Sequence, residues 1–290
     1  MTDSTQVITP GTVSKILWHF TGGPTWNTEK DKQNITPKPA NDAYQCLIKI
    51  IESKELKIGN YSEIVKVKLK LKSRSVSQKK LKRKYVEKTR KIRSKNVCCL
   101  ADIPLIHLGY HSYRYGKFAI GFHRDSAIKN NFNPVLYSLE NSKALKSIYK
   151  GFSNLKNIDI EDLKTESTNI KETFNKCHAD NGESLNDAFA DLDYEIDYLD
   201  THQKNAIESI SHFLAFVKTF DDSEFGSIYT EREWRSTEPF PFDYEDLAMI
   251  VLPKKVGANK YYEEFLNEEI EKIGIPKEIP VVPWEDLVEH

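Results

Sequence analysis

The strand-like and helix-like segments of this sequence do not alternate regularly, and this irregular order limits the folds open to the chain. Apolar runs or alternating apolar residues predict strands at 13–20, 65–72, 97–103, 117–122, 134–137, 227–236, 247–252 and 279–284. Helical spacing predicts helices that begin near Asn41 or Asp42, at Asp125, and over 262–273 before Gly274. A doubly wound parallel sheet needs a helix between successive strands, so we predict a mixed α+β fold.

Positive charge is concentrated in one segment. Lys66 to Lys95 contains fifteen Lys or Arg and a single acid, Glu87, so this segment carries +14 in a chain whose net charge is −1. Residues 65–72 alternate Val or Leu with Lys, which predicts a half-buried strand with its lysines in water, and 79–93 reads as a basic helix. Such a concentrated basic patch indicates an anionic partner, although a solvated basic face is the simpler interpretation.

The stretch from Glu140 to about Asp200 is acidic and irregular, and we expect a helical insertion there, followed by a helix that Thr201 caps. With 39% apolar residues, the 290 residues suit one domain that carries this insertion. No apolar run approaches the roughly 18–20 residues that cross a bilayer, and residues 1–6 lack a signal-peptide pattern. We therefore expect a cytoplasmic protein whose four cysteines are reduced.

The predicted strand at 227–236 carries paired carboxylates. Side chains alternate along a strand, so Glu231, Glu233 and Arg235 share one face while Trp234 faces the core. Two carboxylates on one face repel each other and need cations or a ligand nearby. Spacing alone leaves two interpretations open, a ligand site and a salt-bridged edge strand in water.

Two further segments offer ligand-binding groups. His19 and Thr21 share one face at the end of the first strand, and Arg114 with Tyr115 supplies a cation and an aromatic ring before Gly116. A structural histidine and a plain turn are the alternative interpretations. His107 and His111 lie four residues apart, but Gly109 between them argues against the helix that a shared metal would require, so we expect no metal.

Several sequence blocks in this order resemble the AbiGi-type abortive-infection proteins of bacterial phage defence: residues 17–21, 99–105, 114–122, 133–137 and 231–235. Their layout is also similar to diverged ADP-ribosyltransferases, including DarT-like toxins that modify nucleic acid. That resemblance implies a mostly antiparallel split sheet of ADP-ribosyltransferase type with flanking helices, and NAD⁺ as the substrate.

The resemblance also implies roles for individual residues. Glu233 would be catalytic, with Glu231 positioning or deprotonating the acceptor. NAD⁺ would be bound by His19, Thr21, Arg114, Tyr115 and Tyr113. An RNA or DNA acceptor would contact Lys68, Lys70, Lys72, Lys80, Arg83 and Lys84.

Two other functions remain open at this point. One is a non-catalytic antitoxin or interaction module that neutralises a cognate toxin partner by contact. The other is an NAD⁺ glycohydrolase, in which the same site uses water as the acceptor.

Overall fold

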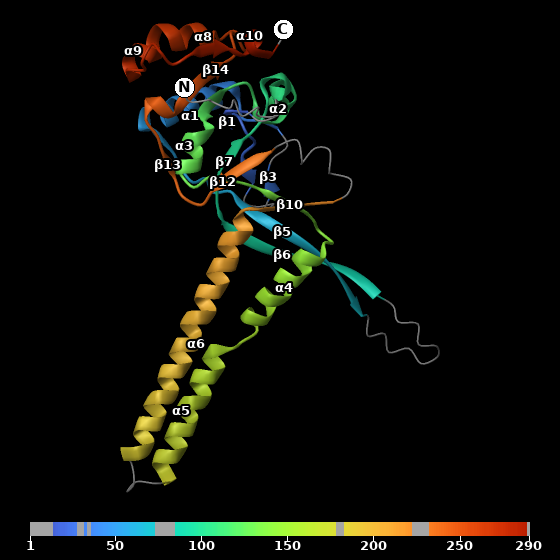
Figure 1. Ribbon diagram of the computed structural model, residues 1–290, viewed down its shortest axis with the longest axis vertical. Coiled ribbons are helices and arrows are strands. Elements are labelled where there is room, and N and C mark those ends of the chain that lie inside the picture. The colour runs from blue at the N-terminus through green and yellow to red at the C-terminus, as the bar shows by residue number, and fades with distance from the viewer. Residues whose placement is uncertain are drawn as a thin grey trace, which may run out of the picture. The chain divides into compact units, whose positions relative to one another are not determined.

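The computed structural model describes residues 14–27, 32–33, 36–72, 85–177, 183–221 and 232–288 (Figure 1). The chain divides into two compact units. The first comprises Met1–Glu63, Lys95–Tyr137 and Ala215–His290, and the second comprises Ile64–Ser94 and Ser138–Leu214. None of the described helices combines the length and the apolar character needed to span a membrane.

The first unit is built on a seven-stranded sheet with the order β15-β14-β8-β1-β7-β12-β9. Only β14 and β15 pair in parallel, and the other registered pairs are antiparallel. The strands of this sheet are β1 (Ile16–Phe20), β7 (Cys98–Ala101), β8 (Ala119–His123), β9 (Asn133–Pro134), β12 (Glu233–Ser236), β14 (Leu247–Leu252) and β15 (Val281–Pro283). The predicted mixed fold with flanking helices is confirmed at this level.

Helices and short strands complete this unit. They are β2 (Trp26–Asn27), β3 (Lys32–Gln33), α1 (Ala40–Ser53), β4 (Glu55–Leu56), the 3₁₀ turn Leu105–His107, α2 (Leu108–Tyr115), α3 (Arg124–Lys129), β11 (Val217–Phe220), β13 (Phe240–Pro241), the 3₁₀ turn Tyr244–Asp246, α8 (Tyr261–Glu264), the π turn Phe265–Glu269, α9 (Ile270–Ile273) and α10 (Trp284–Val288). Gly274 ends α9 in the left-handed conformation, as its position in the sequence predicts.

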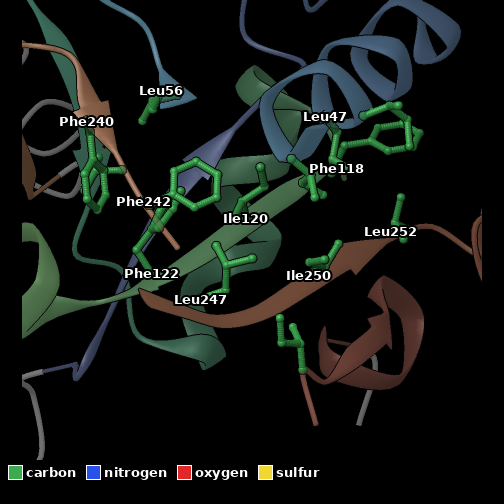
Figure 2. Packing of buried hydrophobic residues seen from close by; sticks show 14 of the residues in the cluster. Leu47, Leu56, Phe118, Ile120, Phe122, Phe240, Phe242, Leu247, Ile250 and Leu252 are labelled. Carbon is green, nitrogen blue, oxygen red and sulfur yellow. The ribbon is translucent and has the colours of Figure 1, made fainter. Parts of the chain in front are cut away.

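Each face of the large sheet has its own core because side chains alternate along its strands. Figure 2 shows one face, whose buried cluster includes Leu47 of α1 with Ile120 and Phe122 of β8 and Phe118 just before that strand. The opposite face buries Trp18, Phe20, Ala119, Val251 and Trp284. The indole N–H of Trp18 donates to the Ile103 carbonyl at 3.1 Å, so this large ring is buried without an unpaired donor.

The second unit contains a two-stranded ribbon, β5 with β6, and three helices. Its elements are β5 (Ser62–Lys72), β6 (Tyr85–Asn96), β10 (Leu136–Leu139), α4 (Lys143–Lys156), α5 (Ile160–Cys177) and α6 (Glu183–Ala215), of which β5, β6, β10 and α6 extend a few residues into the first unit. The alternation predicted at 65–72 holds from Val65 to Lys68, where the valines are buried and the lysines half-exposed, but it does not reach Leu71, which is 37% exposed.

The helix predicted at 79–93 is wrong over its described part. Residues from Tyr85 onward form strand β6, which pairs with β5, and Ile92 and Ser94 alternate inward along it. Lysine and arginine are good helix formers, but this pairing and the burial of alternate residues decide the structure. Residues 79–84 lie outside the described part of the chain.

Three local predictions about helices are also wrong. Helix α1 begins at Ala40 after Pro39, so neither Asn41 nor Asp42 is its cap. Helix α6 runs without a break through Thr201, which donates its hydroxyl to the Asp197 carbonyl instead of capping a new helix. Gly109 lies inside α2, and the expected turn at Arg114 is the last turn of that helix.

Glycine 121 is a position where the fold of the first unit excludes a side chain. A Cβ atom there would lie 2.8 Å from Cγ2 of Ile16 and 3.0 Å from Cζ3 of Trp18. We predict that Gly121→Ala lowers the free energy of unfolding by about 1–3 kcal/mol, because both neighbours are packed in the sheet. Urea unfolding followed by tryptophan fluorescence measures it, since all four tryptophans belong to the first unit.

Gly151→Ala is the matched control. Gly151 lies within α4, and no atom would approach an added Cβ within 4 Å. The same substitution should stabilise α4 by about 0.5–1 kcal/mol, because alanine favours the helix over glycine. Equal effects of the two substitutions in circular dichroism melts would contradict the packing argument.

Candidate functional site

The first unit contains a cleft of about 1300 Å³. It is lined by residues of β1, α1, β7, α2, β11 and β12, and among them are His19, Thr21, Arg114, Tyr115 and Glu233. It is larger than the roughly 300–1,000 Å³ of most small-molecule pockets. The structure thus brings the three separated segments that carry the candidate residues to a single cleft.

The cleft lies where β1 and β7 part. These strands share a single registered pair, Trp18 with Ala101, and Ala101 is in turn paired with Glu233 of β12. Two residues along, Phe20 would face Cys99 if pairing continued. Instead the imidazole Nδ1 of His19 lies 3.1 Å from the Cys99 carbonyl oxygen, so the His19 side chain satisfies a carbonyl that a paired strand would otherwise bind.

His19 is held neutral with a defined tautomer. Burial lowers the pKa of its imidazole to about 4, while the hydrogen bond to Cys99 opposes that shift and the charge of Lys38 adds to it. Since a carbonyl only accepts, Nδ1 carries the proton and donates it. Nε2 is then an acceptor, and the described residues supply no hydrogen-bond donor to it.

Thr21 and the glycines after it fix the edge of the cleft. The Thr21 hydroxyl donates to the Ala43 carbonyl in α1 at 2.8 Å, and its backbone N–H donates to Phe118. A Cβ at Gly22 would lie 2.7 Å from the Tyr115 carbonyl oxygen, so this turn packs directly on the end of α2. Gly116, which ends α2, has a φ of 78°, a conformation that favours glycine.

The Tyr115 residue lines the cleft, and its ring is held in place by the neighbouring His111. It stacks on His111 with 4.2 Å between ring centroids and a 19° interplanar angle. Burial lowers the pKa of His111 to about 4, so the stacked imidazole is neutral as well. The guanidinium of Arg114 lies 5.5 Å from the Tyr115 ring centroid. Tyr113 is 85% exposed and is not among the residues that line the cleft.

Glu233 is the acceptor of a buried ion network. Its carboxylate accepts from Nε and Nη2 of Arg235, both at 2.9 Å, and from Nζ of Lys218 at 3.0 Å. Arg235 is fully buried and donates further to Glu63 at 2.6 Å and to the Ala215 carbonyl at 2.7 Å. The prediction that Glu233 and Arg235 share a strand face while Trp234 packs on the core is confirmed.

The network balances its charges. Burial alone would raise the pKa of Glu233, but the charges of Arg235 and Lys218 outweigh it and hold that pKa well below its usual range. Two carboxylates, Glu63 and Glu233, meet two cations, so the group is neutral as a whole. Burial raises the pKa of the Cys99 thiol, and the charge of Glu233 adds to that shift.

Cations outnumber acids on the cleft wall. The lining includes Lys38, Lys49, Lys57, Arg114 and Lys218 against Glu52, Glu55 and Glu233. A concave surface with this excess of positive charge favours an anionic ligand. Among the residues that the structure describes, no group of three His, Cys, Asp or Glu side chains could hold a metal ion.

The remaining candidate residues lie elsewhere. Lys68, Lys70 and Lys72 belong to β5, where Lys68 pairs with the buried Glu140 at 3.4 Å and Lys70 with Glu87 at 3.7 Å. Glu231, Lys80, Arg83 and Lys84 lie outside the described residues.

Sequence reasoning missed part of this site. Lys218, Glu63 and Lys38 were not singled out, and no local pattern marks them; His111 was considered only as a metal ligand. The sequence did indicate one neighbour of Glu233. Arg235 follows it by two residues on a predicted strand, so their side chains are expected on the same face.

These features define an α+β protein with a mostly antiparallel sheet and a large cleft whose wall carries more cations than acids. Residues 62–285 match a family model described as "Putative abortive phage resistance protein AbiGi, antitoxin". The match covers most of the chain, and the protein belongs to the AbiGi family. It includes Arg114 and Glu233 but not β1 with His19. Neither a curated protein nor a solved structure matches the chain.

Removing Arg235 should destabilise the first unit strongly. Arg235→Leu removes the buried cation that pairs with both Glu63 and Glu233. We predict a loss of about 3–5 kcal/mol in the free energy of unfolding, since a broken buried ion pair leaves a charge uncompensated. Urea unfolding measures it. The control is Lys254→Leu, which removes a surface cation paired with Asp286 and should cause no measurable loss; similar losses in both variants would contradict the prediction.

The pH dependence of His19 provides a separate test. In the unfolded chain an imidazole binds a proton below about 6.5, whereas folded His19 stays neutral down to about 4. Between these values the unfolded state binds more protons, so this group reduces stability as pH falls through that range. NMR titration of the imidazole signal that His19→Asn removes should show no protonation above pH about 5 in the folded protein. A midpoint near that of the urea-unfolded chain would disprove burial of this ring.

Proposed function

We propose that this AbiGi protein acts in phage defence by binding NAD⁺ in the cleft and transferring its ADP-ribose to a macromolecular acceptor. One observation carries the proposal. His19 of β1 and Glu233 of β12 line the same cleft, whose volume and positive charge suit a dinucleotide. On this proposal the parted strands β1 and β7 are the split sheet of an ADP-ribosyltransferase.

Each binding group has chemistry that suits a part of NAD⁺. The Nε2 acceptor of His19 takes a hydrogen bond from a ribose hydroxyl. The pyrophosphate pairs with cations of the cleft wall, among them Arg114, whose guanidinium can bind two phosphate oxygens. The Tyr115 ring, held by its stack on His111, offers a flat surface to a base or to nicotinamide.

The reaction breaks the bond between ribose C1′ and the nicotinamide nitrogen. The electron pair of that bond leaves with nicotinamide, which becomes neutral, and the ribose gains oxocarbenium character. A carboxylate facing this cation stabilises the transition state more than the ground state. An acceptor nitrogen or oxygen then attacks C1′ and loses its proton to a base, the role proposed for Glu231. Water in place of the acceptor would make the protein an NAD⁺ glycohydrolase.

The ion network sets a condition on this chemistry. Both oxygens of Glu233 accept hydrogen bonds from cations, which reduces the negative charge available to an oxocarbenium ion. Catalysis by Glu233 therefore requires Lys218 to leave it when NAD⁺ binds, and the cationic pyrophosphate site offers Lys218 an alternative anion. Arg235 is fully buried and remains as the positioning group.

A nucleic acid is the proposed acceptor because the β5–β6 ribbon carries a row of lysines on one strand. Lys66, Lys68, Lys70 and Lys72 alternate along β5, and phosphates bind such a row without base recognition. Phosphate binding at Lys68 competes with its pair to Glu140.

The direct test incubates the protein with NAD⁺ labelled on the adenylate, together with single-stranded RNA, single-stranded DNA or cell lysate. We expect nicotinamide release with label on one class of acceptor. Glu233→Gln should lower nicotinamide release by about 10²–10³-fold, by analogy with the loss of one transition-state contact. Glu231→Gln should affect transfer more than release, because its proposed role concerns the acceptor.

Glu238→Gln is the matched control. It changes an exposed glutamate just after β12 that bonds Asn131, and activity should be unchanged. Circular dichroism must show each variant folded. If the wild-type protein releases no nicotinamide with any acceptor, the enzymatic proposal fails.

The family description favours a second function, an antitoxin that neutralises a cognate toxin by contact. The fully bonded carboxylate of Glu233 is also what a purely structural ion network requires. Expression in bacteria separates the two functions. Growth arrest that Glu233→Gln relieves and Glu238→Gln does not would reject the antitoxin, whereas harmless expression that protects cells from a co-expressed partner would support it.

A further inference from the structure

Helix α6 uses only one side to pack against α5, beside which it lies in Figure 1. Phe189 meets Phe174 with 5.9 Å between ring centroids, and Asp193 and Asp200 pair with Lys171 and Lys164 of α5. The Nε2 amide of Gln203 donates to the carbonyls of Leu155 and Ile158. These contacts define the inner side of α6.

Two tyrosines lie on the outer side. Tyr198 is nine positions after Phe189, which places it about 180° away at roughly 100° per residue. Tyr194 and Tyr198 are 69% and 54% exposed and stack on each other with 6.4 Å between centroids, and the ring of His202 continues the row 4.1 Å from Tyr198. Large rings exposed in a row are typical of a protein contact surface.

Acidic residues lie beside these rings on the same side of α6. Asp187, Asp191 and Glu195 are spaced four residues apart and exposed, and the structure pairs none of them with a described cation. From 183 to 203 the sequence has seven acids and no Lys or Arg. Like charges four residues apart repel each other, and a cationic partner docked on this row would relieve that repulsion. We name the surface made by these acids with Tyr194 and Tyr198 the acidic tyrosine row.

The same unit carries a surface of opposite charge. On the β5–β6 ribbon, Lys70, Lys88 and Arg90 are exposed, and Glu87 is the single exposed acid among its described residues. Lysine and arginine bind both carboxylates and tyrosine faces, so these residues match both components of the acidic tyrosine row. The complement of the row is thus present on every copy of the chain.

We propose that the protein self-associates, with the acidic tyrosine row of one copy docked on the β5–β6 ribbon of a second copy. Such a contact joins two different surfaces, so each copy offers both and a reciprocal pair closes as a dimer. This contact does not use the cleft, but it shares the β5–β6 ribbon with the proposed nucleic-acid acceptor, so the two compete for Lys70. Because it joins opposite charges on solvent-exposed surfaces, it weakens with salt.

Sedimentation velocity of the full chain tests the proposal. We expect association in low-salt buffer over a concentration series and monomers in about 1 M NaCl, where the Debye length falls to about 3 Å. Tyr194→Ser with Tyr198→Ser should weaken association at least about tenfold, since aromatic anchors dominate such contacts. A wild-type protein that stays monomeric at low salt across the series overturns the proposal.

Charge-reversal variants locate the contact. Asp191→Lys with Glu195→Lys should abolish association, and so should Lys88→Glu with Arg90→Glu on the ribbon. The matched control, Glu166→Lys with Glu172→Lys, makes the same charge change at exposed positions of α5 and should associate like the wild type. All four positions of the two helix variants are exposed, so helical content by circular dichroism should not distinguish these variants.

Mixing provides the decisive measurement. The helix variant has a basic row and a basic ribbon, and the ribbon variant has an acidic row with its ribbon charge reduced or reversed. Each fails to associate alone, but an equimolar mixture should form mixed dimers in low salt. If the helix variant still associates alone, or if the mixture stays monomeric, the two surfaces are not partners and the proposal is wrong.

Discussion

The burial of Arg235 is the constraint on which the first unit depends. Its guanidinium has no contact with water, and it joins Glu63, which is 172 residues away in sequence, to Glu233 and to the carbonyl of Ala215. An unpaired buried charge costs several kcal/mol of stability. The folded state therefore requires the segments that carry Glu63, Glu233 and Ala215 to stay beside Arg235. The network therefore fixes where β12 lies, and with it the position of Glu233 in the cleft.

The second condition on the cleft is the parting of β1 from β7 after one registered pair. A parted sheet leaves backbone carbonyls without ladder partners, and such groups are costly when buried. The Nδ1–H of His19 donates to one of these carbonyls, that of Cys99, which leaves Nε2 as a hydrogen-bond acceptor. On the proposed function, this side chain both satisfies a carbonyl of the parted sheet and accepts a hydrogen bond from the ligand. A structural histidine and a ligand-binding histidine were alternatives from the sequence, but the geometry makes them compatible.

Periodicity predicted the elements whose burial repeats locally. Leu47, Ile48 and Ile51 recur at helical spacing in α1, and Val65 and Val67 alternate in β5, so their faces were readable. Where a structure depends on a residue far away in the sequence, local patterns did not predict it. Tyr85 to Arg93 has a helix-forming composition yet forms a strand because β5 lies beside it, and nothing near Arg235 indicates that Glu63 and Lys218 surround it. Composition also indicated charge without showing that the lysines of β5 already have acidic neighbours.

Glu233 holds one negative charge that both the fold and the proposed chemistry require. While Arg235 and Lys218 bond it, the carboxylate contributes to stability and cannot fully oppose a developing cation on a ribose. The two cations differ, however. Arg235 is enclosed and also bonded to Glu63, whereas Lys218 lines the cleft, where a phosphate group can reach it. A bound dinucleotide can therefore draw away one counter-ion while the other keeps the strand in place. On the proposed function, a ligand that lacks phosphate has no such effect, so this asymmetry would favour anionic nucleotides.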